Sequence, residues 1–118
     1  MARTVSLAQS ASVVLDSNGN GTAEVGPAAP GEVWHPGSTS ITCGGQIPTT
    51  GTPTLFIYAG NGISNGTFID STYNVTGASS SMISGKLLYP GQQVFAVWSS
   101  GPPGQTATLA VNGTRSVP

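Results

Sequence analysis

The sequence has 118 residues, a formal net charge of −1 and only 6% charged side chains. It has one His and one Cys but 17 Gly and 9 Pro. Most enzymes need several ionisable groups to move protons, and nucleic-acid binding needs clustered Lys and Arg to neutralise phosphates. We therefore expect one domain that is neither an enzyme nor a nucleic-acid-binding protein.

Membrane and secretion signals are missing from the pattern. No apolar run approaches the roughly 20 residues of a spanning helix, and Met1–Arg3 is not followed by the apolar segment of a signal peptide. A single Cys excludes an internal disulfide. We expect a protein that is made in the cytoplasm and does not insert into a membrane.

The first ten residues show little hydrophobic pattern. We interpret 1–10 as an extended N-terminal arm, and 11–118 as the folded domain. An arm of this kind can add a strand to a partner protein through main-chain hydrogen bonds. Its candidate contact residues are Arg3, Thr4, Val5 and Leu7.

The first strand signals flank a turn. Ser12–Leu15 and Thr22–Val25 are joined by Asp16–Gly21, whose Asn and Gly residues tolerate positive φ. This pattern predicts a β-hairpin. The turn also matches the first half of an EF-hand loop, with Asp16, Asn18 and Asn20 as candidate Ca²⁺ ligands, but the position of the bidentate Glu is Pro27. We therefore favour a plain turn without a cofactor over a weak Ca²⁺ site.

Short apolar runs bounded by Gly and Pro continue along the chain, and helical periodicity is nearly absent. The strands expected here are 32–35, 39–43, 54–59, 79–83, 93–98 and 106–111. Pro36–Gly37 is expected to turn or bulge the chain, and Ile63–Gly77 to form a loop with short strand pieces. The run 54–59 is apolar on both faces, which is typical of a central or covered strand.

The total of about eight strands predicts an all-β fold. We expect a single antiparallel β-sandwich, either jelly-roll-like or immunoglobulin-like. Alternation places Val94, Ala96 and Trp98 on one face of their strand, with Phe95 and Val97 on the other.

Candidate site residues are few. Trp34 and Tyr73 could contribute to a platform that stacks on sugars, although such aromatics more often fill a core. His35 and Cys43 have too few companions for a zinc site, which needs three or four ligands. We expect no catalytic and no metal-binding residue.

Several turns and strand cores carry a resemblance to a known group. The segments concerned are Gly31–Trp34, Leu55–Gly60, Phe68–Thr72, Leu88–Gln92, Val97–Gly101, Pro103–Gly104 and Ala107–Gly113. Together, over residues 31 to 113, they resemble small virion-associated proteins of tailed phages of actinobacteria.

This resemblance implies a compact β-sandwich on the surface of the phage particle and offers no functional residues to transfer. The implied role is a capsid decoration or head-fibre protein. The alternative is a minor tail protein that binds a glycan of the host surface. The implied partners are the major capsid protein or another virion protein, together with further copies of the chain in an assembly.

Overall fold

The computed structural model describes residues 3–27, 29–46, 48–49, 51–64, 67–72, 76–82 and 86–118. These residues form eight strands and no α-helix. The strands are β1 (Arg3–Val14), β2 (Gly21–Val25), β3 (Val33–Cys43), β4 (Thr54–Gly60), β5 (Phe68–Thr72), β6 (Gly77–Met82), β7 (Gln93–Ser99) and β8 (Thr106–Val117).

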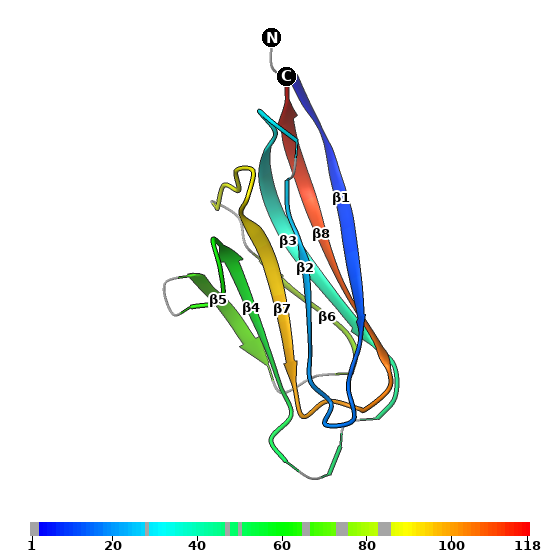
Figure 1. The fold of residues 1–118 in the computed structure, drawn as a ribbon. Helices are drawn as coiled ribbons and strands as arrows, with labels where there is room; N and C mark the ends of the chain where they lie inside the picture. The colour runs from blue at the N-terminus through cyan, green and yellow to red at the C-terminus, as the bar shows by residue number, and fades with distance from the viewer. Residues whose placement is uncertain are drawn as a thin grey trace.

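The strands lie in two four-stranded sheets that pack face to face (Figure 1). One sheet has the order β1-β8-β3-β6 and the other has the order β2-β7-β4-β5, and every pairing is antiparallel. The sandwich is elongated, 52 × 25 × 20 Å, because β1, β3 and β8 are eleven or twelve residues long while β2, β4, β5 and β7 have five to seven. Both ends of the chain lie at one end of the molecule.

The strand order identifies the sandwich as a jelly roll. The first strand pairs with the last, β2 with β7, β3 with β6, and β4 with β5. This is a set of nested antiparallel pairs rolled over two sheets, with β8 joined to β3 and β7 joined to β4. An immunoglobulin sandwich has a different order. The expected all-β sandwich is therefore confirmed, in its jelly-roll form.

The core lies between the sheets and follows the alternation of side chains along each strand. Val94, Ala96 and Trp98 of β7 are buried there, opposite the buried β8 residues. Ala107, Leu109 and Val111 are the β8 residues concerned, and all three are fully buried. Val94, Ala96 and Trp98 therefore share the inner face, as the alternation predicted, and Phe95 on the other face is also largely covered, with 8% of its surface exposed.

The N-terminal segment is not a separate arm. Residues 3–10 belong to β1, whose twelve residues pair with β8 from Arg3↔Val117 to Val14↔Thr106. The boundary expected after residue 10 does not occur, because Leu7 is buried in the core and the segment adds a complete edge strand to the long sheet. Met1 and Ala2 lie outside the described residues.

The turn at residues 16–20 reverses the chain but does not make a hairpin. β1 belongs to one sheet and β2 to the other, so the turn crosses between the layers and the predicted β1–β2 pairing is wrong. The turn is held by a contact with the loop after β7, in which the Gly101 amide donates a hydrogen bond to the Gly19 carbonyl at 2.9 Å. A local turn signal predicts a reversal and contains no information about the sheet that the next strand joins.

Two strands extend beyond their expected limits. The separate runs 32–35 and 39–43 are both parts of β3, which continues through a register shift between Pro36 and Ser38. β8 continues through Asn112–Gly113, which was expected to end it, and Gly113 lies opposite Pro36. A side chain at this position would collide with the His35 carbonyl oxygen. The glycine permits a close backbone approach at the bulge.

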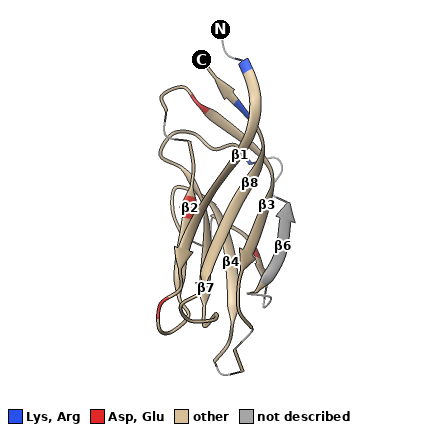
Figure 2. Cartoon of the chain, turned by 90° about the vertical axis from the view of Figure 1, so that its right-hand side faces the viewer, with Lys and Arg blue, Asp and Glu red and all other residues tan. Residues whose placement is uncertain are grey.

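Charged side chains are sparse over the whole surface. Figure 2 shows the long strands β1, β8 and β3 almost without coloured residues between their ends. The outer face of this sheet instead has small side chains, among them Ser10, Ala110 and Ser40 in one cross-strand row. The two outer faces of the sandwich therefore differ, because the other one is aromatic.

Candidate functional site

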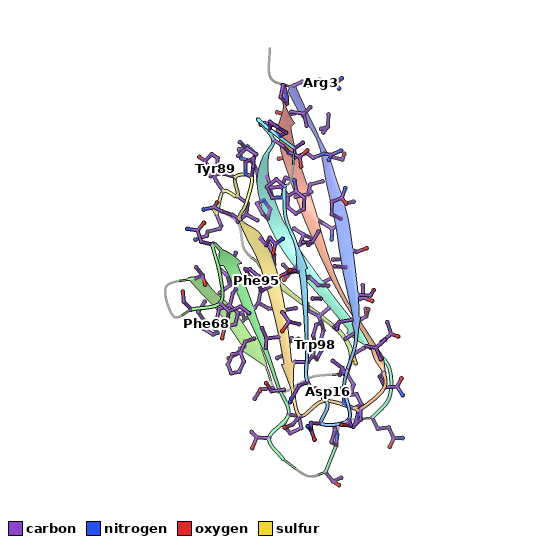
Figure 3. The ribbon with its side chains drawn as sticks, in the orientation of Figure 1. Arg3, Asp16, Phe68, Tyr89, Phe95 and Trp98 are labelled. Carbon is purple, nitrogen blue, oxygen red and sulfur yellow. The ribbon has the colours of Figure 1, made fainter. Side chains whose placement is uncertain are left out.

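The outer face of the sheet β2-β7-β4-β5 carries a group of apolar side chains. We define the aromatic face as Phe56, Tyr58, Phe68, Phe95 and Val97. Phe68 and Phe95 are labelled on this sheet in Figure 3. Strand register places Tyr58 between Phe68 on β5 and Phe95 on β7, while Phe56 lies beside Val97.

Alternation along β4 explains why these rings point outward. Leu55, Ile57 and Ala59 are buried in the core, so the intervening Phe56 and Tyr58 occupy the opposite face. Both rings are only partly buried. The register of the β4–β5 pairing shifts between Ile57 and Tyr58 of β4, and this bulge aligns Phe68 of β5 with Tyr58.

Three rings of the aromatic face contact one another. The ring centroids are 6.4 Å apart for Phe56–Tyr58, 6.2 Å for Phe56–Phe68 and 5.8 Å for Tyr58–Phe68. The two pairs that include Phe68 have the edge-to-face geometry that aromatic quadrupoles favour. Phe68 nevertheless leaves 46% of its surface exposed, so the cluster presents an uncharged apolar surface.

The predicted N-terminal contact residues divide into two kinds. Arg3 and Thr4 are exposed at the start of β1, and Val5 is partly buried. Leu7 is only 2% exposed and contributes to the core. Leu7 therefore stabilises the sandwich and does not reach a partner.

Trp34 lies in the core with 2% of its surface exposed, as such aromatics more often do, so the alternative place on a sugar-stacking platform does not apply to it. Its indole nitrogen donates a 2.7 Å hydrogen bond to the Glu32 carboxylate, which is also 3.6 Å from the Arg115 guanidinium. Glu32 is itself buried. This charged cluster holds the long strands to the segment before β3. Tyr73, the other predicted platform residue, lies outside the described residues.

The candidate calcium ligands make hydrogen bonds that shape their own loop. One Asp16 carboxylate oxygen accepts from the backbone amides of Asn18 and Asn20, at 2.8 and 2.9 Å. The Asn20 side-chain oxygen accepts from the Ser100 amide at 3.1 Å. In the described part of the chain, no three His, Cys, Asp or Glu side chains gather as a metal site would require.

An open cavity of about 300 Å³, with both polar and apolar walls, lies between three loops at the same end of the sandwich. Its walls include Ser17, Asn18, Pro48, Gly51 and Ser100. The backbone of Ser100 has φ +56°, a left-handed conformation that is uncommon outside glycine. The hydrogen bond from its amide to Asn20 holds this conformation in place.

His35 and Cys43 do not meet. Both belong to β3 and are eight positions apart, so they lie roughly 25 Å apart along the strand. His35 is exposed, with its Nε2 3.3 Å from the Ser116 hydroxyl. Burial raises the pKa of the Cys43 thiol, so the reactive thiolate is scarce at neutral pH.

The aromatic face as a whole could not be predicted from the sequence, although one signal in the sequence points to it. The run 54–59 was expected to be apolar on both faces, which is what an inner strand with an apolar outer surface requires. Phe68 falls in the segment that is expected to be a loop with short strand pieces, and β5 is one such piece. Its alignment with Tyr58 depends on the β4–β5 pairing, which no local pattern specifies.

Comparison with known proteins found no matching family model, no similar curated protein and no similar solved structure. The likeness to phage virion proteins therefore remains a prediction from the sequence. Within the described residues, no helix is long and apolar enough to cross a lipid bilayer.

Proposed function

We propose that the chain is a structural, non-catalytic virion protein that decorates the outer surface of a phage head and docks there through the aromatic face. It would be made in the host cytoplasm and incorporated into particles in many copies. Jelly rolls occur in viral capsid proteins, lectins and cupins. This is an analogy of fold, which is compatible with the proposal without selecting it.

The aromatic face is the observation on which the proposal depends. Exposed apolar clusters mark interaction surfaces on soluble proteins, and aromatic residues dominate the binding energy of many interfaces. The Phe68 ring is exposed and is packed against Tyr58 and Phe56, so it loses little side-chain entropy on binding. We place the docking site on the aromatic face and not on the expected N-terminal arm, because residues 3–10 belong to β1 and pair with β8.

The sparse charge of the chain predicts how this docking responds to salt. With seven ionisable Asp, Glu, Lys and Arg residues in the whole sequence, steering by charge is weak. Apolar contact and the avidity of many copies on one lattice would supply the affinity. We expect binding to heads to change little with ionic strength, in contrast to an electrostatic interface.

Cosedimentation with heads that were assembled without this protein tests the proposal. Phe68→Ser should weaken binding tenfold or more, because an interface anchor is worth over about 1.4 kcal/mol. Tyr89→Ser is the matched control, since Tyr89 is 49% exposed and is not part of the aromatic face. Equal binding by the two variants, or no binding by the wild type, would contradict the proposal.

The loop cavity favours a second candidate, a minor tail protein that binds a neutral glycan of the host. Sugar hydroxyls suit the polar side chains of Ser17, Asn18 and Ser100. The buried Trp34 plays no part in this version. Binding to a glycan array that is lost in Asn18→Ala and retained in Phe68→Ser would favour the tail role over decoration.

A further inference from the structure

The free edge of β1 differs from the other sheet edges in having no protection. β1 is the first strand in the order β1-β8-β3-β6, and none of the described strands pairs with its other side. Exposed edge strands are templates for pairing with another chain, and natural proteins protect them with short length, charges, Pro or bulges. The edges of this molecule can be compared on those criteria.

The second sheet has protected edges. β5 is five residues long, contains a bulge at its junction with β4, and carries the Asp70 carboxylate opposite Ile57. β2 is also five residues long, includes Glu24, and is followed by Gly26 and Pro27. The other edge of the long sheet is β6, which is also short, with six residues.

β1 has none of these protections. It is twelve residues long, its register with β8 is unbroken, and it contains neither Pro nor Gly. Arg3, at its first position, is its only charged residue. Figure 2 shows the rest of the strand uncoloured. The strand is about 40 Å long and most of its residues are exposed.

We propose that β1 pairs with β1 of a second copy of this chain, antiparallel and edge to edge, so that the two long sheets form one eight-stranded sheet. This inference does not rest on the proposed function, because it concerns a different surface and would hold for any role of the sandwich.

Self-pairing suits the residues of β1. In an antiparallel pair, directly opposed residues point to the same face of the sheet. The two-fold axis must therefore lie where a residue faces its own copy. Ala8 and Gln9, at the middle of β1, are the central positions for such an axis. An axis at Ala8 sets Ser6 opposite Ser10 of the second copy, and Thr4 opposite Ser12. Such hydroxyl pairs form cross-strand hydrogen bonds, as Ser12 and Thr108 do within the chain at 2.8 Å.

Charge also favours a second copy as the occupant. In the self-paired arrangement the two Arg3 side chains lie at opposite ends of the interface, and no like charges face each other. A net charge of −1 opposes association only weakly. The outer-face residues of β1 are small, so the junction between β1 of one copy and β1 of the other is flat.

Sedimentation velocity over a range of protein concentrations tests this inference. The wild type should form a dimer, and Ala8→Lys should raise its dissociation constant about tenfold or more, because two lysines then meet at the junction. Asn112→Lys is the control: Asn112 is exposed on the same face, directly opposite Ala8 but on β8. It should change the dissociation constant less than about twofold, since surface substitutions away from a contact have small effects.

Disulfide trapping then locates the axis. Cα atoms of residues at the axis lie about 4.5–5.5 Å apart, within the range of a disulfide. Ala8→Cys or Gln9→Cys should therefore form an oxidised dimer, while Asn112→Cys should not; the buried Cys43 leaves this background low. A monomeric wild type, equal weakening by both lysine variants, or a dimer that neither β1 cysteine can trap would overturn the inference. A wild type that stays monomeric but captures an extended strand of another virion protein would also overturn it.

Discussion

At the scale of single residues, some glycines are required by their surroundings and others only by their backbone angles. Gly19 and Gly104 have nearly the same φ, +78° and +77°. A side chain at Gly19 would collide with the backbone of Gly101, whereas a side chain at Gly104 would meet nothing within 4 Å. This pair separates steric overlap from conformational strain.

We predict that Gly104→Ala lowers the free energy of unfolding by about 1 kcal/mol, the cost of a left-handed conformation for a residue with a Cβ. Gly19→Ala should cost at least about 2 kcal/mol, because the loops at 16–20 and 100–104 must also separate. Urea denaturation measures both. Equal losses in the two variants would show that the contact between these loops is not tight.

The buried Glu32 provides a second test at this scale. Glu32→Ala removes the acceptor of the Trp34 indole and the ion-pair partner of Arg115, so we expect a loss of about 2 kcal/mol. Glu24→Ala, at an exposed position of β2, should stay within about 0.5 kcal/mol of the wild type. Thermal unfolding of the two variants checks the difference; similar melting temperatures would contradict the role given to Glu32.

At the scale of elements, the pairing of β1 with β8 makes the N-terminal segment part of the folded domain. A free arm would make Leu7 dispensable for folding. In the structure Leu7 is buried in the sheet that β1 completes. Deleting residues 1–10 would therefore weaken the fold itself, and lost binding in such a deletion would say little about a partner.

We predict that Leu7→Ala lowers the unfolding free energy by about 3 kcal/mol, as for other buried leucines. Thr4→Ala, on the same strand but exposed, should change it by less than about 0.5 kcal/mol. Denaturant titration distinguishes the two accounts of the segment, since a free arm predicts no loss in either variant.

Strand positions and faces could be predicted where the pattern is local. The alternation in β7 placed Val94, Ala96 and Trp98 on one face, and the structure turns that face to the core. Pairing partners could not be predicted in this way. Thr4–Ser10 has only two sizeable apolar residues, Val5 and Leu7, so its strand character depends on β8, about one hundred residues away.

At the scale of the whole molecule, the pairing is almost entirely non-local. Among the strand pairs that the structure describes, only β4 and β5 are consecutive in the chain, and the first strand pairs with the last. The number and spacing of the expected strands predicted a sandwich, but the choice of the jelly-roll order depends on these distant pairings. The same is true of the aromatic face, because Phe68 joins it only through the β4–β5 register.

Non-local pairing has a kinetic consequence. Closing long loops before contacts form costs entropy, so we predict refolding in milliseconds to seconds, as for other all-β domains. Stopped-flow fluorescence can follow it, since Trp34 and Trp98 are both buried in the native state. Folding in microseconds would contradict the strand order. Brief unfolding before refolding removes slow phases from the nine prolines.

The most direct test of the central claim is the location and copy number of the protein in purified phage particles. Quantitative mass spectrometry of separated heads and tails measures both. Decoration predicts many copies per particle, found with the heads and lost when Phe68 is replaced by Ser. A few copies confined to tails would support the glycan-binding alternative, and absence from both fractions would contradict a virion role.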